Sequence, residues 1–435
     1  MVGFVVHCPR EIRSYADQFK DLLSTVEYQS FVAVLCAAIF GTAGYCDIFR
    51  YFLFSPSVSS LWRFFNEEGM VEKLTRRHRR MLRRLLPAMH KEPGRFLWVI
   101  DDTLTCRSGK GENTWGAYWW HDHNTKGKIF GHKVLTLGIV DRKRQVLIPI
   151  AWEMLHRKVE LSEAENYQKG WEHSLELLDL AVSEGFPKFT VVADSWFSGD
   201  EFFSNLVTRG YDFVSEVRCN RKVARYKRQS MELRVDDFFV TRNRSNIYFH
   251  SKCKWAAEAN LLFNDATVRL KTVAVANKKN LDEKAFGYYV SNKLTWNASK
   301  IWGIFRDRWA IEVQFRELKQ FFTFGEAAVW NESAVRMSIA LSMIALTVIR
   351  LEQGSRVGAN EDQHVRPCAA GDIVRQFMLE SFRQGLTKLA HENLGKPLRH
   401  RIAQRINPEN LKSKPAEVRG SRKTHISQEL QRQAA

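Results

Sequence analysis

The sequence lacks the cysteine patterns that build disulfide frameworks and zinc sites. Its seven cysteines are scattered and odd in number, and none belongs to a C-x-x-C pair. This distribution argues against both kinds of structure and favours a reducing cytosol. Residues 1–18 also lack the basic region, apolar run and small-residue cleavage site of a signal peptide. We therefore expect the chain to act in the cytoplasm.

Long uncharged apolar runs are scarce as well. The run at 31–46 is interrupted by Gly41 and Gly44, and the run at 337–349 is too short to cross a bilayer. We interpret both runs as buried core helices and expect no membrane partner.

Acidic residues are outnumbered, with 48 Asp and Glu against 66 Lys and Arg and a formal net charge of +18. A positive field of this size indicates a polyanionic partner, usually nucleic acid, although charge alone does not separate DNA from RNA or an anionic membrane. Basic residues are concentrated between Lys73 and Arg84. A solvated charged face is the alternative, but the run has almost no compensating acid, so we predict phosphate contacts. The arginines of this run are Arg76, Arg77, Arg79, Arg80, Arg83 and Arg84, and the contact residues predicted from them are Arg76, Arg77, Arg80 and Arg83.

Apolar patterns divide the 435 residues into regions, with enough length for two or three domains. Helical spacing comes first, short apolar strands begin at Phe96, and the end of the chain is polar and basic. The predicted regions are a helical DNA-binding domain at 1–92, the first part of a catalytic domain at 93–219, a β-rich insertion at 220–286, the second part of the catalytic domain at 287–355, and a basic C-terminal region with a flexible tail at 356–435.

The predicted catalytic domain has three strands in a row and then alternates helix with strand. That order is typical of an α/β fold with a mixed five-stranded sheet and flanking helices. The predicted strands are 96–102, 132–140, 145–154, 189–195 and 211–218, with further strand-like runs at 232–240, 245–252 and 267–276 in the insertion. The predicted helices are 162–184, capped by Ser162, 200–210, 299–322 and 333–352, and 107–120 is predicted as a loop.

Two aspartates follow apolar strands of this predicted sheet. Asp101 ends the first strand and Asp194 ends the fourth. Carboxylates at the ends of neighbouring strands can share a hard cation such as Mg²⁺. Taken singly, each is more often a capping residue. Asp102 is adjacent to Asp101, and because successive strand residues face opposite ways, only one of the two should be a ligand.

The predicted helix at 299–322 supplies a third acid. Phe305, Arg308, Glu312 and Lys319 are spaced so that all four fall on one helix face, while a separate apolar stripe docks on the core. Glu312 can therefore face a site while the helix stays buried along its other side. An ordinary amphipathic helix with surface ion pairs is the alternative interpretation.

These acids and their surroundings resemble the DDE transposases of bacterial insertion sequences. The likeness is to the group whose third motif reads Tyr, two residues, Arg, three residues, Glu, six residues, Lys, abbreviated YREK. Here Phe305 stands in the tyrosine position, which removes a hydroxyl, and the remaining motif residues are Arg308, Glu312 and Lys319. The first motif, Asp-x-Thr, is present at 101–103 and selects Asp101 over Asp102. The second, Ala-Asp-Ser followed by an aromatic pair, is present at 193–197.

The resemblance implies an RNase H-like catalytic domain and a cut-and-paste DNA transposase. Such an enzyme binds the terminal inverted repeats of a transposon, hydrolyses phosphodiester bonds, and transfers the resulting 3′-hydroxyl to target DNA, here with a hairpin intermediate. Asp101, Asp194 and Glu312 are the implied catalytic and metal-binding residues for two Mg²⁺ ions, with Mn²⁺ as a substitute. Arg308 and Lys319 are expected to position phosphates. The resemblance also implies double-stranded DNA as partner, a homodimer in the active complex, and a bacterial cytoplasmic, nucleoid-associated location.

Other interpretations stay open at this point. His121, His123 and His132 have a spacing that allows a zinc site, although no cysteine is nearby. A nuclease or resolvase of the same fold would use the same acids without strand transfer. A catalytically inactive DNA-binding protein would not need all three acids. The basic helical region and the β-rich insertion favour the transposase, because both suit holding long DNA.

Overall fold

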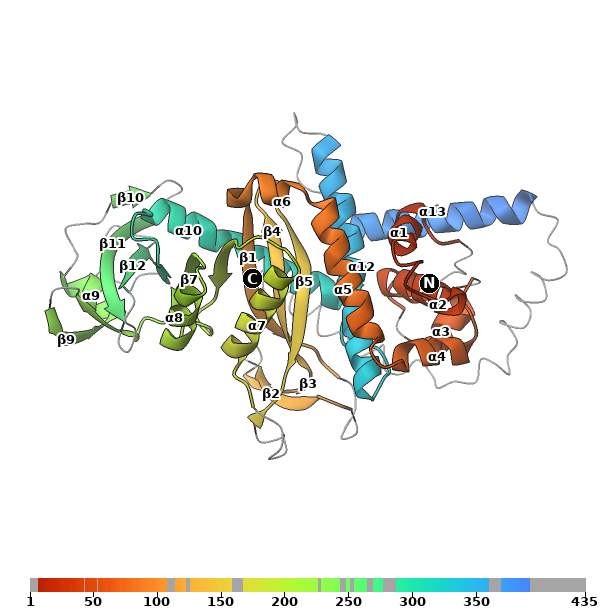
Figure 1. The fold of residues 1–435 in the computed structure, drawn as a ribbon, viewed down its shortest axis with the longest axis horizontal. Helices are drawn as coiled ribbons and strands as arrows, with labels where there is room; N and C mark the ends of the chain where they lie inside the picture. Colours follow the sequence, from red (N-terminus) through yellow and green to blue (C-terminus); the bar gives the residue numbers. More distant parts are fainter. Residues whose placement is uncertain are drawn as a thin grey trace, which may run out of the picture.

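The chain folds around one large mixed sheet with helices on both faces. The computed structural model describes residues 7–42, 44–52, 54–107, 114–122, 126–158, 167–225, 228–242, 248–250, 254–263, 269–276, 287–359 and 369–391. A group of N-terminal helices lies at one end of the molecule and the strands after residue 220 lie at the other, with the sheet between them (Figure 1). The predicted α/β class, with a mixed sheet and flanking helices, is confirmed.

The N-terminal region is helical, as its apolar spacing predicts. Its helices are α1 (Arg10–Asp17), α2 (Thr25–Ile39), α3 (Tyr45–Tyr51), α4 (Val58–Asn66), α5 (Met70–Leu85) and α6 (Ala88–Lys91). Ser24 begins α2 with a capping box, in which the backbone N–H of Ser24 donates to Glu27 Oε2 at 2.6 Å. Because α2 is apolar on most sides, it is buried among the other helices, as expected for residues 31–39 of the apolar run at 31–46. The rest of that run is not a buried helix, since α2 ends at Ile39 and Cys46 is exposed.

Five strands form the central part of the sheet. They are β1 (Phe96–Leu104), which follows a short 3₁₀ helix η1 (Pro93–Arg95), β4 (Lys133–Asp141), β5 (Val146–Leu155), β6 (Thr190–Ala193) and β7 (Phe213–Val217). Their order across the sheet is β5-β4-β1-β6-β7. Strand β4 runs antiparallel to β1 and to β5, whereas β6 is parallel to β1 and to β7.

These five strands do not form a separate sheet, so the prediction of a five-stranded sheet is wrong in its extent. Strand β13 (Gly287–Ser291) pairs with β7 and continues an eleven-stranded sheet into the strands after residue 220. Those strands are β8 (Lys222–Arg225), β9 (Arg228–Arg234), β10 (Tyr248–His250), β11 (Lys254–Phe263) and β12 (Arg269–Ala276). Backbone groups at the edge of β7 thus pair with β13 rather than with water. The domain boundaries given above stay predictions.

Several predicted elements have other bounds or another type. The strand predicted at 232–240 ends in a helix, α9 (Val235–Arg242), whose first turn carries Asp236 and Asp237. The helix predicted at 162–184 is α7 (Gly170–Ser183); residues 167–169 are not helical, and the cap at Ser162 lies outside the described residues. The predicted loop at 107–120 includes part of a two-stranded ribbon, β2 (Tyr118–Asp122) with β3 (Gly127–Gly131).

The helix predicted at 299–322 is two helices. They are α10 (Ala298–Asp307) and α11 (Trp309–Phe321), and Arg308 is the residue between them. The backbone at Arg308 stays in the right-handed helical region, with φ −56° and ψ −31°. The two helices therefore follow each other closely, so Arg308 and Glu312 keep their one-turn spacing.

Alternate residues of β1 point into two hydrophobic cores. Leu97 and Val99 belong to the core that contains α2, α10, α11 and α12 (Glu332–Ala359), whereas Trp98 and Ile100 belong to the core that contains α7 and α8 (Asp200–Thr208). Following the same alternation, Asp101 faces the α10 and α11 side and Asp102 faces the other.

Helix α12 is long and apolar, and it lies at the centre of the molecule. The segment Glu332–Ser355 has the length and composition of a membrane span, but 89% of its most apolar window is buried inside the protein. It packs against α2, α5 and β5. It is thus a buried core helix, as expected for the run at 337–349.

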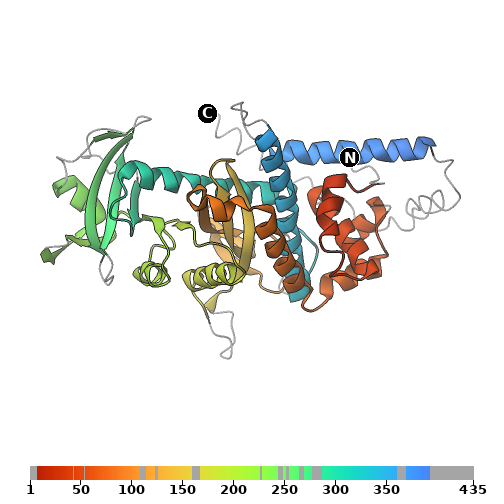
Figure 2. The same cartoon turned by 45° about the horizontal axis from the view of Figure 1, so that its top comes forward.

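The last described element is α13 (Ala370–His391), which runs alongside the N-terminal helices (Figure 2). The Ser381 hydroxyl donates a hydrogen bond of 2.6 Å to the backbone oxygen of His7, so α13 is tied to the start of the chain. The tail predicted after it lies outside the described residues.

Candidate active site

Asp101 and Asp194 emerge from neighbouring parallel strands. Ile100 of β1 pairs with Ala193 of β6, so the two aspartates are the next residues on adjacent strands. Asp194 is half-buried, and its Oδ1 accepts the backbone N–H of Trp196 at 2.9 Å. Parallel pairing thus brings the first and second predicted acids together at one edge of the sheet.

Arg308 links the first predicted acid to the third. Its Nη1 lies 2.7 Å from Asp101 Oδ2, and its Nη2 lies 2.5 Å from Glu312 Oε1. The side chains of Arg308 and Asp101 are each 14% exposed, whereas that of Glu312 is 36% exposed. Charge-assisted hydrogen bonds of this kind are strong, so the guanidinium holds α11 against β1. It also lies between two of the three predicted acids.

The acids outnumber the positive charge that holds them. Burial and the neighbouring charge of Asp194 raise the pKa of Asp101 to about 8, with Arg308 acting in the opposite direction. A further carboxylate, Glu216 on β7, has a raised pKa because of burial and because of the charges of Asp194 and Glu312. Four carboxylates therefore share the field of one guanidinium, which leaves a region of negative potential.

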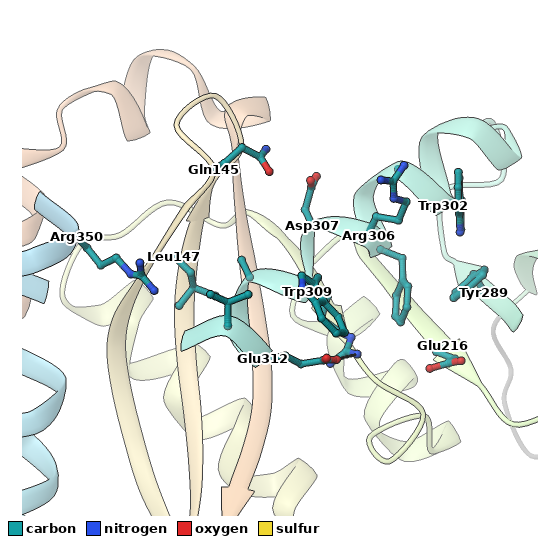
Figure 3. A pocket seen from close by; sticks show the side chains of 15 residues that line it. Gln145, Leu147, Glu216, Tyr289, Trp302, Arg306, Asp307, Trp309, Glu312 and Arg350 are labelled. Atoms are coloured by element: carbon teal, nitrogen blue, oxygen red, sulfur yellow. Dashed lines mark hydrogen bonds and ion pairs between the residues drawn. The ribbon is translucent and has the colours of Figure 1, made fainter. Parts of the chain in front are cut away.

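A cavity of about 940 Å³ opens beside these residues (Figure 3). Its residues include Glu216, Arg308 and Glu312, and Figure 3 shows the side chains of Glu216 and Glu312 directed toward each other. Trp309, also on its wall, is 61% exposed. Phe305, in the tyrosine position of the motif, lines the same cavity and packs against Tyr289 with ring centroids 4.5 Å apart.

Lys319 and Asp102 lie at a different cavity. This smaller space of about 230 Å³ is also lined by Lys133 and by Trp120 of the β2–β3 ribbon. Lys133 Nζ lies 3.2 Å from Asp102 Oδ2 and 4.0 Å from the centre of the Trp196 ring. Asp102 therefore pairs with Lys133 and not with Arg308. The two predicted phosphate ligands, Arg308 and Lys319, are thus placed at separate cavities.

The predicted DNA-contacting arginines of α5 divide into two groups. Arg76 and Arg80 are exposed, as is Arg84. Arg77 instead donates to Asp21 at 2.5 Å, and Arg83 donates to the backbone oxygen of Glu184 at 2.9 Å. The structure thus directs Arg77 and Arg83 toward protein partners, and phosphate contact by any of the four stays a prediction.

Metal-binding geometry is incomplete as the side chains stand. Within the described parts of the chain, no three His, Cys, Asp or Glu side chains are grouped closely enough to hold a metal ion. Arg308 occupies the space between Asp101 and Glu312. For the alternative zinc site, His132 is buried with its Nε2 3.0 Å from the backbone oxygen of Trp115, and His123 lies outside the described residues.

Sequence reasoning missed Glu216, Tyr289 and Lys133. The available signal for Glu216 was an acid within a largely buried strand, FVSEV, which is costly unless the acid serves a site. Tyr289 is on the strand that pairs with β7, directly opposite Glu216. No pattern in the sequence predicts the pairing of β7 with β13.

Two family models match the chain. A model described as DDE superfamily endonuclease matches residues 55–236, and a model described as transposase DDE domain matches residues 159–348. The first range includes Asp101 and Asp194, and the second includes Asp194 and Glu312.

No curated protein matches this chain significantly. Among solved structures, the chain is similar to the piggyBac transposase in a synaptic complex with hairpin DNA, with 12% identity and a TM-score of 0.45 over 88% of this chain and 76% of that one. The family assignment rests on the two sequence models. The chain therefore carries the endonuclease domain of the DDE superfamily and is a DNA-cleaving transposase.

Proposed function

We propose that this protein is a cut-and-paste DNA transposase of the YREK group of bacterial insertion sequences. It binds the terminal inverted repeats of its transposon, cleaves the DNA there, and joins the freed 3′-hydroxyl to target DNA. The observation that carries the proposal is the convergence of three sequence motifs. Asp101 from β1, Asp194 from the end of β6 and Glu312 from α11 all lie in the field of Arg308.

The acidic residues fit divalent metal ions in the chemistry of their donors. All three are carboxylates, the ligands that Mg²⁺ and Mn²⁺ prefer. The guanidinium of Arg308 stands in for a cation between Asp101 and Glu312. The pKa of Asp101 is raised by burial and, to a smaller extent, by the charge of Asp194, which a cation would neutralise. Two such ions, when bound, activate the attacking oxygen and stabilise the leaving oxygen.

The chain's own residues then divide the remaining work. Asp101, Asp194 and Glu312 would hold the metal ions through their carboxylates. Arg308 holds α11 on β1 and would place its positive charge near the cut phosphate. Lys319, at the other cavity, would contact a phosphate farther along the strand. Arg76 and Arg80 are exposed on α5 and would contact DNA away from the cut.

Other parts of the proposal concern fold class and setting. The strand order β5-β4-β1-β6-β7, with two antiparallel pairings followed by two parallel pairings, supports an RNase H-like catalytic core. We further propose a hairpin intermediate, a homodimer acting on paired ends, and a location in the bacterial cytoplasm on nucleoid DNA. These follow from the resemblance of the motifs.

The test is cleavage of labelled DNA carrying the sequences that flank the source gene, with Mg²⁺ present. Wild type is expected to cut at the ends, while Glu312→Gln binds the same DNA without cutting. Glu332→Gln, an exposed acid at the start of α12, is the matched control and should cut like wild type. Equal cutting by wild type and Glu312→Gln would exclude Glu312 from the site. Binding without cutting by wild type would favour an inactive DNA-binding protein.

A further inference from the structure

Glu216 is a half-buried acid that none of the three motifs includes. It lies on β7, opposite Tyr289 of β13, and lines the same cavity as Arg308 and Glu312. Among the described residues, its carboxylate makes no hydrogen bond or ion pair. A carboxylate in this position is destabilised unless a positive charge reaches it.

Arg308 has a hydrogen-bonding group to spare. Its two terminal nitrogens are used by Asp101 and Glu312, but its Nε is buried and has no partner. A guanidinium has five N–H donors in a fixed fork, so a shift of the side chain can exchange one carboxylate for another.

Cation binding would force such a shift. The Asp101 and Glu312 oxygens that hold Arg308 are the same atoms that a divalent cation needs. The cation would also repel the guanidinium at close range. Arg308 then needs another carboxylate, because leaving its charge buried and unpaired is strongly unfavourable.

Glu216 is the acid best placed to receive it. The cavity that Arg308 lines has three acidic side chains, Glu216, Asp307 and Glu312. Asp307 is already held by Arg142, whose Nε lies 2.7 Å from Asp307 Oδ2. Arg308 already lowers the pKa of Glu216, against the larger effect of burial, so the two charges interact in the present arrangement.

We propose that Glu216 is a positioning residue that accepts the Arg308 guanidinium when a divalent cation replaces it on Asp101 and Glu312. The proposal rests on the proposed function, because it assumes that these acids bind the catalytic metal. In the metal-free site, the Arg308 guanidinium neutralises the acids. When the metal ion binds, the guanidinium moves away from them and pairs with Glu216.

The test measures Mn²⁺ binding to the full-length protein without DNA, by the electron paramagnetic resonance signal of free Mn²⁺. Glu216→Gln should weaken Mn²⁺ binding by about tenfold, as for residues that support metal ligands. Arg308→Gln should bind Mn²⁺ at least as tightly as wild type, and adding Glu216→Gln to it should change little. Asp307→Asn removes a negative charge from the same cavity and is the matched control, expected to stay close to wild type.

The other outcomes contradict either the positioning role of Glu216 or the proposed function. If Glu216→Gln weakens binding equally with and without Arg308, Glu216 acts on the metal directly and the positioning role is wrong. An effect no larger than that of Asp307→Asn also overturns it. Wild type that binds no Mn²⁺ contradicts the proposed function itself. Should Glu216→Gln fail to fold, Glu216→Asp keeps the charge but shortens its reach, and the same loss of affinity is expected.

Discussion

Helix α5 and the junction of α10 with α11 both place arginines against acids, with opposite results. On α5, Arg79 forms two hydrogen bonds of 2.7 and 2.9 Å to Glu184, one arginine for one acid, and both side chains are almost fully buried. At the junction, the single guanidinium of Arg308 lies in the field of Asp101, Asp194 and Glu312. A balanced buried pair fastens two helices together, whereas an excess of acid leaves a place for a cation.

The largest change in the free energy of unfolding is expected at the Arg79–Glu184 pair, where one arginine balances one acid. Arg79→Met removes the partner of Glu184 and leaves a carboxylate buried and unpaired, which costs about 3–5 kcal/mol. Chemical denaturation followed by circular dichroism measures this loss. Arg80→Met, one residue along on the exposed face, is the control and should change stability by less than about 0.5 kcal/mol. Equal effects of the two variants would mean that the pair with Glu184 contributes nothing special.

The second expected effect is at Asp101, where a substitution should raise the free energy of unfolding rather than lower it. Its pKa is raised to about 8 in the folded protein, so the folded state holds a proton that the unfolded state releases between about pH 4 and 8. Stability from this group therefore falls as pH rises through that window. Asp101→Asn should stabilise the metal-free protein by on the order of 1–2 kcal/mol near pH 8, and by less at pH 5, while abolishing cleavage. A variant less stable than wild type at pH 8 would show that the bond to Arg308 outweighs burial.

The third effect concerns the buried face of α5. His78 is fully buried, with Nδ1 2.5 Å from the Tyr15 hydroxyl, and burial lowers its pKa to about 4. Between about pH 6.5 and 4, the His78 imidazole therefore takes up a proton in the unfolded state but stays neutral in the folded state. The free energy of unfolding thus falls as the pH falls through this range. His78→Gln should remove up to about 3 kcal/mol of this acid sensitivity, measured as the difference in unfolding free energy between pH 7 and pH 4. His132, whose pKa burial also lowers to about 4, stays in the variant and leaves part of the slope. An unchanged slope would contradict the assignment to His78.

The smallest stability effect is expected on the exposed face of α5. Replacing Arg76, Arg80 and Arg84 by Gln should change the unfolding free energy by less than about 0.5 kcal/mol each. DNA affinity should fall, and the salt dependence of binding should decrease by about one counterion per residue. Filter binding or fluorescence anisotropy across a salt series measures both. Arg375→Gln, an exposed arginine on α13 that pairs with Asp372, is the control. A triple variant with an unchanged salt slope would place the DNA elsewhere.

Strong local signals predicted much of the fold. The apolar runs at β1, β4, β5, β6 and β7 were identified as strands because buried strands need uninterrupted apolar residues. The β2–β3 ribbon was missed because Tyr118, Trp119 and Trp120 are consecutive aromatic residues, which lack the alternation of apolar and polar residues that indicates a strand. Of the strand predicted at 232–240, residues 232–234 lie in β9 as predicted, but residues 235–240 belong to α9. That part was wrong because FFV is apolar in either structure, and a helix with acids in its first turn is favoured by its dipole.

The candidate site was predicted in part. Glu312 and Arg308 one turn apart follow from helical geometry, and their direct bond at 2.5 Å agrees with it. Lys319 was predicted to position phosphates together with Arg308, but the two residues line different cavities. Lys319 lies two helical turns after Glu312, at the cavity beside Asp102. For the α5 arginines, charge composition does not reveal which ones face an acid from another element.

By itself, the sequence determined the chemistry of this protein: an excess of positive charge for DNA, two acids after apolar strands, and a third acid one turn after an arginine. Those features are local, and local geometry is enough to read them. Only the tertiary structure decided that Arg308 pairs with Asp101, that Glu216 lies at the same cavity, and that Arg79 is buried while Arg80 is not. These outcomes depend on which strands pair and which helix faces pack, and long-range contacts of that kind leave no periodic trace in the chain.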